Sequence, residues 1–480
     1  MCSSDLSDDG QVYVSRDDGA NWANATSKIP NAPKWAYVSK VEPSKFAEGT
    51  VYVTFDGHRS GDYGTYVYAS ADFGASFRSI GGNLPAGVVV RTITEDIKNQ
   101  DVLYLGAENG LFVTTDRGRS WVRVKANFPT VPVYEITLHP RDNDMILATH
   151  GRAVWILDDL TPFQRYSVAA GKDAHVFEVE PAVERMAAED RMREFEGDMA
   201  FLGANPPVGA PITYHLKSKA DSVRIVIKDG SGALVRELKG DDLKTKTAVG
   251  VNTVVWDFRV EPLPPSKRPG AAGFAFFGNG RDGPVVLPGA YSAALFVNGK
   301  EAASSPVQVQ LDPEIRVAAA DLKERFDVLK QLHGLNATLT MATDAVRDAD
   351  DQLGAIRKAL PDSTKIPAPI KASMDSLTKE LSGLKRKLGI RTPGEDLFSV
   401  DFAELRRALP IRMSMTAGDI GGAQVKPSDV NRQMITGLTA EIPGAVAEVN
   451  GFLAKLKPFY VRLAEAGLYP VSPPPVGGVR

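Results

Sequence analysis

The sequence has almost no cysteine, no long hydrophobic run and no excess of charge of one sign. Cys2 is the single cysteine among 480 residues, which excludes an internal disulfide framework and a zinc site built from several thiolates. No apolar run approaches the roughly 18–20 residues of a membrane-spanning helix, so we expect no transmembrane segment. The 56 Lys and Arg residues nearly balance the 59 Asp and Glu residues, and no basic block indicates a nucleic-acid partner.

What the sequence does contain, from residue 9 to residue 182, is a series of short runs of Val, Tyr, Ile and Thr separated by Gly, Asp, Asn and Pro. Such a pattern is typical of many short β-strands. Three related stretches recur within it, SRDDGANW (15–22), SADFGASF (70–77) and TTDRGRSW (114–121). Their spacing of roughly 50 residues is close to the length of a four-stranded propeller blade.

Each copy of the motif fits a tight turn between two strands. The Asp carboxylate can accept backbone hydrogen bonds, the Gly can take a positive φ, and the aromatic ring can cover the hairpin. These tasks are local, and equivalent turns of separate blades cannot converge on one ligand, so the motif predicts a structural role. The residues are Ser15, Asp17, Gly19 and Trp22; Ser70, Asp72, Gly74 and Phe77; and Thr114, Asp116, Gly118 and Trp121.

Residues 9–182 therefore predict a partial β-propeller of about three and a half blades. A closed propeller needs at least about four blades, because open sheet edges invite aggregation. We therefore expect N-terminal blades of the same protein to precede this segment. Residues 1–8 are expected to be a partial strand behind a foreign start, since MCSSDL (1–6) matches the translation of a short sequencing adapter.

Two further domains are predicted after a charged, irregular connector at 183–205. Residues 206–312 alternate like strands and predict an immunoglobulin-like β-sandwich, in which Trp256 and Tyr291 fill the core. A Phe-rich insert at 269–284 interrupts this segment, and the sequence assigns it no role. The fold class expected for the whole chain is multidomain, mainly β plus α.

The α part is residues 313–470, where apolar residues recur at steps of three and four. The pattern predicts a long antiparallel helical hairpin and a further helix that begins near Ser428, a good N-cap residue. A dimer through this helical domain is an alternative use of its leucines. The tail 471–480 is expected to be disordered.

The motif S-x-D-x-G-x-x-W is the Asp-box of BNR-type propellers, with Phe77 as one departure. Together with FDGHRSGDYGTYVYASADFG, HPRDNDMILATHGRAVWILDD and NPPVGAPITYHL, it makes the chain resemble the C-terminal half of bacterial BNR, sortilin-like (VPS10-like) propeller proteins, often labelled glycosyl hydrolases. The resemblance implies an exported protein, periplasmic or extracellular, whose signal peptide is not in this sequence.

In an antiparallel blade with strands A to D, the Asp-box turns join strands C and D, and the B–C loops lie on the opposite face. A binding site away from the motifs would therefore be built from B–C loops. Carboxylate, imidazole and guanidinium groups on one rim could bind a sugar or a peptide carboxylate. The binding candidates are Asp56, His58, Arg59, Asp62, Tyr63, Glu108, Asn109, His150 and Arg152.

Structural interpretations of the same residues remain open. Arg59 and Asp62 could form an ion pair that stiffens a long loop, and His150 could cap the end of its strand. Glycoside hydrolysis needs two carboxyl groups roughly 5–10 Å apart, for which Asp56 and Glu108 are the candidates, although no complete catalytic pair is identified. No spacing predicts a metal site or a cofactor.

The sequence thus favours a propeller protein that recognises an extracellular glycan or polypeptide through its B–C loops. A glycoside hydrolase on the same scaffold is one alternative, and a non-catalytic assembly scaffold is another. The fold by itself does not choose among them.

Overall fold

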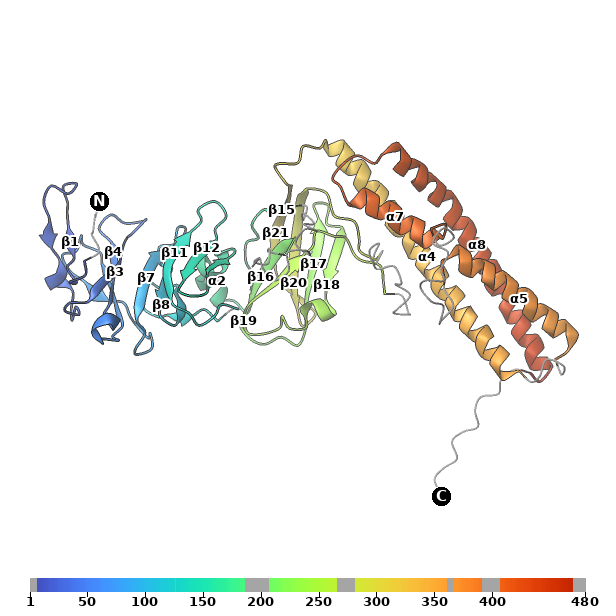
Figure 1. The fold of residues 1–480 in the computed structure, drawn as a ribbon, viewed down its shortest axis with the longest axis horizontal. Helices are drawn as coiled ribbons and strands as arrows, with labels where there is room; N and C mark the ends of the chain where they lie inside the picture. The colour runs from blue at the N-terminus through green and yellow to red at the C-terminus, as the bar shows by residue number, and fades with distance from the viewer. Residues whose placement is uncertain are drawn as a thin grey trace, which may run out of the picture.

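The computed structural model describes residues 7–125, 127–185, 207–265, 281–360, 366–390 and 406–468. Along the long axis of Figure 1, a row of small sheets comes first, a second β unit follows, and long helices come last. The predictions for the start of the chain at 1–6, for the tail, and for most of the connector and of the Phe-rich insert lie outside the described residues.

The first part of the chain forms small antiparallel sheets, each built from strands consecutive in sequence. Two of these sheets have four strands, one has three, and a two-stranded sheet precedes them. The strands are β1 (Tyr13–Val14) and β2 (Ala23–Asn24); β3 (Tyr37–Pro43), β4 (Val51–Asp56), β5 (Tyr66–Ser70) and β6 (Arg78–Ser79); β7 (Val90–Glu95), β8 (Leu103–Ala107), β9 (Gly110–Thr114) and β10 (Val122–Arg123); and β11 (Val133–Leu138), β12 (Met145–Thr149) and β13 (Val154–Leu157).

These sheets pack face to face through their first strands. All six residues of β7 are buried, because β7 lies between β3 and β11. The Ser39 hydroxyl donates to the Val90 carbonyl at 3.2 Å, and the Thr94 hydroxyl donates to the Ile136 carbonyl at 3.1 Å. This packing brings the loops that follow the second strands of neighbouring sheets to one end of the stack.

The three repeated turns share one hydrogen-bond pattern, shown by the second copy. The Ser70 hydroxyl donates to Asp72 at 2.8 Å and accepts from the Gly74 amide at 2.9 Å. The Ser76 amide and hydroxyl also donate to Asp72, at 2.9 and 2.6 Å. The equivalent glycines of all three copies, Gly19, Gly74 and Gly118, have positive φ.

The second β unit consists of two sheets around a shared core. Trp256 is fully buried in this core and Tyr291 packs edge-on against it with ring centroids 5.3 Å apart, as expected from the sequence. The strands are β14 (Ala174–Val176), β16 (Ala210–Leu216) and β19 (Gly250–Trp256) in one sheet, and β15 (Ala182–Glu184), β21 (Lys300–Leu311), β20 (Gly289–Val297), β17 (Val223–Asp229) and β18 (Leu234–Leu238) in the other.

The positions of β14 and β15 differ from the predicted boundary between the propeller segment and the connector. The predicted propeller segment ended at 182 and the connector began at 183, but β14 pairs with β16 and β15 pairs with β21. Both strands therefore belong to the second β unit. Three-residue strands are too short to show a period, so only their pairing reveals where they belong. The short helices α1 (Thr161–Gln164) and α2 (Tyr166–Ala170) precede them.

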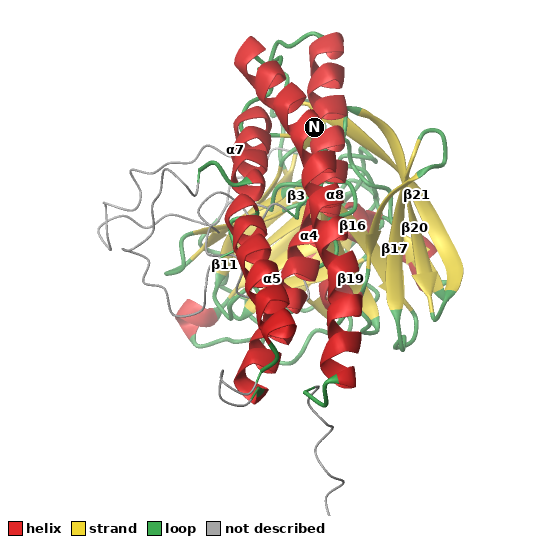
Figure 2. Ribbon diagram, turned by 90° about the vertical axis from the view of Figure 1, so that its right-hand side faces the viewer, coloured by secondary structure: helices red, strands yellow, loops and turns green. Residues whose placement is uncertain are grey.

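The described C-terminal helices form a bundle in which the last of them packs against three others that the structure describes (Figure 2). The predicted N-cap is confirmed, since Ser428 and Asn431 form a reciprocal capping box. In the described part of the chain, no helix is both long and apolar enough to cross a membrane. The helices are α4 (Ala319–Ala359), α5 (Ala368–Lys387), α7 (Leu409–Gly421) and α8 (Asp429–Glu465).

Candidate functional site

The candidate site lies where β4, β8 and β12 end. Because neighbouring strands are antiparallel, this end also carries the beginnings of β3, β7 and β11. Asp56 is the last residue of β4, and Glu108 directly follows β8. The sequence-predicted B–C loops therefore gather at one end of the three sheets.

Arg91, near the start of β7, joins the two candidate carboxylates. One terminal nitrogen of its guanidinium bonds Asp56 Oδ2. Its Nε lies 2.9 Å and its other terminal nitrogen 2.5 Å from Glu108 Oε2. The guanidinium carbon also lies 4.9 Å from the ring centroid of Tyr134, in cation–π geometry. The side chain of Arg91 is 6% exposed, so a nearly buried cation fixes both carboxylates.

His58 completes this cluster from the other side of Asp56. The His58 ring Nδ1 lies 2.6 Å from Asp56 Oδ1, and the His58 amide donates to the same oxygen at 3.0 Å. The His58 Nε2 atom lies 3.5 Å from a terminal nitrogen of Arg91. Both oxygens of the buried Asp56 are therefore occupied by protein groups.

The predicted ion pair between Arg59 and Asp62 is not among the interactions of the described residues. The Arg59 guanidinium instead lies 5.9 Å from the ring centroid of Tyr37. Asp62 accepts from the Gly64 amide at 2.9 Å and from the Tyr66 hydroxyl at 2.8 Å. Burial, followed by this bond to Asp62, raises the pKa of Tyr66 to about 12. One carboxylate oxygen of Asp62 is bound within the backbone turn and the other is bound by Tyr66. Asp62 therefore stiffens this loop by tying the turn to Tyr66.

Two further candidates, His150 and Arg152, lie in the loop between β12 and β13. The His150 ring lies 5.7 Å from the ring of Tyr134, so His150 joins the cluster through that tyrosine. Its backbone amide donates to the Pro132 carbonyl at 3.0 Å, a bond that does not involve the imidazole ring. Arg152 is exposed, and its guanidinium donates to the neighbouring Gly151 carbonyl at 3.2 Å.

Asn109 follows Glu108 in the second B–C loop and contributes mainly through its backbone. Its carbonyl accepts from Arg123 at 2.6 Å. Its buried side-chain Oδ1 has no hydrogen-bond partner among the residues that the structure describes. The burial of this oxygen is therefore not offset by a hydrogen bond within the described residues.

Sequence reasoning missed several residues at this end of the sheets. Arg91 and Tyr134 lie in first strands, and Trp35 and Tyr37 lie where a chain enters β3. Trp35 is 75% exposed and has a positive φ. The strand order could have identified these residues. The segment that leads into the first strand of each sheet lies at the same end as the B–C loops.

The contacts among Asp56, Arg91 and Glu108 differ from the arrangement that glycoside hydrolysis needs. Asp56 and Glu108 bind the same guanidinium, so Arg91 fills the space between them. A glycosidase instead keeps its two carboxyl groups apart and leaves the scissile bond between them. No group of three or more His, Cys, Asp or Glu side chains in the described part of the chain is placed to hold a metal ion. Arg91 therefore holds both candidate carboxylates in one cluster.

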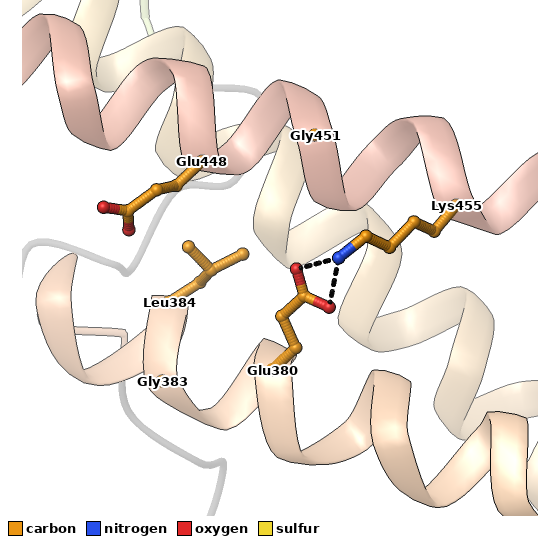
Figure 3. A pocket seen from close by; sticks show the side chains of 6 residues that line it. All are labelled: Glu380, Gly383, Leu384, Glu448, Gly451 and Lys455. Atoms are coloured by element: carbon orange, nitrogen blue, oxygen red, sulfur yellow. Dashed lines mark hydrogen bonds and ion pairs between the residues drawn. The ribbon is translucent and has the colours of Figure 1, made fainter.

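A cavity of about 330 Å³ lies elsewhere, between α5 and α8 (Figure 3). Gly383 and Gly451 leave it open because neither carries a side chain. Lys455 bonds both oxygens of Glu380, at 2.8 and 2.9 Å, and Glu448 is bound by Lys387. The charges around this cavity are thus already paired within the bundle.

One family of known proteins matches part of the sheet-forming segment. Residues 65–169 match the family described as "Sortilin, neurotensin receptor 3", a stretch that runs from the β4–β5 loop to α2. This match supports a sortilin-like propeller for that part of the chain. A search of curated proteins finds no match.

Solved structures with similarity to the chain include a GH74 xyloglucanase from Xanthomonas campestris, with 17% identity over 32% of this chain and 24% of that chain, at a TM-score of 0.27. PorZ, a surface component of the type-IX secretion system of Porphyromonas gingivalis, has 12% identity over 62% of this chain and 35% of that one, at 0.26. An ancestral GH74 enzyme has 9% identity over 64% and 40%, at 0.25. The chain thus spans well under two thirds of the length of each.

Proposed function

We propose that the chain is part of an exported, sortilin-like propeller protein that recognises an extracellular glycan through the end of its sheets described above. We call this end the B–C surface. The observation that carries the proposal is the Arg91 clamp, which holds groups from different strands in one fixed arrangement. The B–C surface consists of Trp35, Tyr37, Asp56, His58, Arg59, Tyr63, Arg91, Glu108, Tyr134 and His150.

The clamp supports recognition because it fixes polar groups before a ligand arrives. Glu108 is 47% exposed at its side chain and uses only Oε2 to bind Arg91. Its Oε1 can therefore accept from a ligand hydroxyl without breaking the clamp. A binding group whose rotamer is already fixed loses less conformational entropy when the ligand binds.

Exposed aromatic rings around the clamp favour a glycan. Trp35, Tyr63 and Tyr134 are 75%, 61% and 46% exposed. An amphipathic ring can pack on the C–H face of a sugar while polar groups beside it bind the hydroxyls. A polypeptide is the alternative ligand class, since the same rings and charges could bind side chains.

The alternative of glycoside hydrolysis through Asp56 and Glu108 is less well supported. Asp56 is 4% exposed and both of its oxygens are occupied. A hydrolase at this site would first have to displace Arg91. An assembly scaffold without a ligand leaves the exposed aromatic rings without a role.

The test is a glycan array followed by calorimetry on the intact chain. We expect saturable glycan binding that Tyr63→Ala or Glu108→Gln weakens at least about tenfold, a loss of about 1.4 kcal/mol. Phe46→Ala is the matched control, because Phe46 is 44% exposed and lies in the A–B loop at the other end of the sheets. It should leave the affinity unchanged.

Other outcomes distinguish the alternatives. Release of reducing ends, abolished by Asp56→Ala or Glu108→Ala, would establish the hydrolase instead. Binding of peptides but not of glycans would retain the surface and change the ligand class. Equal loss of affinity in Phe46→Ala and Tyr63→Ala would reject the B–C surface as the site.

A further inference from the structure

A second cavity lies where the second β unit meets the helical bundle, remote from the B–C surface. Its volume is about 340 Å³. It is lined from β15, from the segment after β19, from α4 and from the α7–α8 link. Its polar lining consists of the acidic Glu184 and Asp257, the basic Arg185, Arg259 and Arg325, and Gln424.

Two acceptor oxygens at this cavity have no donor among the described residues, and one of them, Gln424 Oε1, is buried. Glu184 and Gln424 are 7% and 4% exposed, and the Gln424 amide nitrogen donates to Glu184 Oε1 at 2.8 Å. The buried Oε1 of Gln424 has no partner among the described residues. Glu184 Oε2 likewise makes no bond within the described residues, and burial raises the pKa of this carboxyl. A donor from a ligand would satisfy both oxygens.

Two of the three arginines that line this cavity, Arg259 and Arg325, have guanidinium groups that are only partly engaged. Arg325, 6% exposed, donates through Nε to the Ile420 carbonyl at 3.1 Å and through one terminal nitrogen to the Gly421 carbonyl at 2.9 Å. Arg259 donates one terminal nitrogen to the Gly283 carbonyl at 2.9 Å. Each guanidinium keeps one terminal nitrogen that is not engaged by the described residues.

The positive charges are close enough to act on Glu184, and both lower its pKa against the effect of burial. Neither arginine forms a direct ion pair with Glu184 among the described residues. Opposite charges thus face one cavity without touching. Such an arrangement suits a guest that carries both a positive and a negative group.

Three apolar side chains also line the cavity, beside the charged groups of Arg185 and Asp257. Phe258 is buried, Val285 is half-buried, and Val208 is 48% exposed. The cavity therefore offers an acceptor pair, a donor pair and an apolar wall. A volume of about 340 Å³ falls at the lower end of the range for small-molecule sites.

We propose that this cavity binds a small zwitterion with an apolar side chain, such as a free branched-chain amino acid. Its ammonium group bonds Glu184 Oε2 and Gln424 Oε1. Its carboxylate accepts from the open nitrogens of Arg259 and Arg325, and its side chain packs on Val208, Phe258 and Val285. This site is independent of glycan recognition at the B–C surface.

The first experiment uses the unaltered chain and a series of probes. L-Leucine should bind saturably in calorimetry and raise the melting temperature, since a ligand that binds only the folded state stabilises it. Leucinamide lacks the carboxylate and N-acetyl-leucine lacks the ammonium group, so each should bind at least about tenfold more weakly. The absence of leucine binding up to about 10 mM, above the millimolar range of weak small-molecule sites, would overturn the proposal.

The second experiment uses matched variants. Glu184→Gln and Gln424→Met should each weaken leucine binding at least about tenfold. Glu301→Gln, on an exposed position of β21, and Gln331→Met, on an exposed position of α4, should leave it unchanged. Equal binding of leucine and both blocked analogues would show an apolar cleft without zwitterion recognition, and would reject the proposal even if a variant failed to fold.

Discussion

The indole nitrogen of Trp121 donates to the carbonyl of Ile80 at 2.8 Å, a bond that links two neighbouring sheets. The Trp121 amide also donates to Asn83 Oδ1 at 2.6 Å. In the first copy of the motif, Trp22 instead donates to Gly19 within its own turn and stays 44% exposed. The sequence suggested that the aromatic residue of each motif acts within its own turn. Trp121 differs, because a neighbouring sheet lies within reach of its indole nitrogen.

Trp121→Phe should lower the free energy of unfolding by about 1–3 kcal/mol, since it leaves a buried carbonyl without its donor. Trp22→Phe is the matched control and should change the free energy by less than about 0.5 kcal/mol, because its bond is at the surface. Chemical denaturation of both variants measures the difference. Equal effects would show that the bond between sheets adds nothing.

Glu95 joins the two four-stranded sheets at the end opposite the B–C surface. It is 1% exposed and accepts from the Ser44 hydroxyl at 2.9 Å, the Lys45 amide at 2.6 Å and the Tyr52 hydroxyl at 2.9 Å. Burial and then the charge of Glu95 raise the pKa of Tyr52. Glu95→Ala should cost about 3 kcal/mol of stability, because it leaves several donors unpaired.

The control for Glu95 is Glu135→Ala. Glu135 pairs with Lys40 at 2.8 Å, but its side chain is 48% exposed. Such a surface pair contributes less than about 1 kcal/mol. A denaturation midpoint shifted as far by Glu135→Ala as by Glu95→Ala would contradict the importance of burial here.

The turn at Asp72 should resist acid. Hydrogen bonds, first from the Ser76 hydroxyl and then from the Ser76 amide, lower the pKa of Asp72 from its ordinary 3.8 to about 2. Because the folded pKa is the lower one, the contribution of Asp72 to stability is present above about pH 3.8 and is lost as the pH falls through about 2. Carboxyl chemical shifts in NMR would follow this titration.

Ser76→Ala should move the Asp72 midpoint upward toward 3.8, because it removes the largest cause of the shift. Ser79→Ala, on β6 of the same sheet, does not bond Asp72 and should leave the midpoint in place. An unaltered chain in which Asp72 titrates near 3.8 would refute the turn geometry.

The start of α8 depends on its capping box. The Asn431 amide donates to the Ser428 hydroxyl at 3.1 Å, and the Ser428 amide donates to the Asn431 side chain at 2.9 Å. Ser428→Ala should lower stability by about 1 kcal/mol. Ser382→Ala, at an exposed position inside α5, should cost less or stabilise, and circular dichroism during thermal unfolding compares the two.

The sequence by itself determined the features that depend on neighbours along the chain. Short runs of Val, Tyr, Ile and Thr between Gly, Asp, Asn and Pro predicted the strands of the two four-stranded sheets, and the Ser-x-Asp-x-Gly pattern predicted turns whose bonds span at most a few residues. The cap at Ser428 is local in the same way. The sequence also placed Asp56, His58 and Glu108 at one end of the sheets, because the order of the strands determines at which end each loop lies.

Only the tertiary structure decided which groups meet. Arg91 reaches Asp56 and Glu108 across 35 and 17 residues of chain, and a β-strand pattern does not show that one of its residues is a buried cation. Glu184 and Gln424 are separated by 240 residues, yet they share a bond at the second cavity. Such contacts arise when separately formed elements pack, because burial leaves each polar group to find whatever partner the packing supplies.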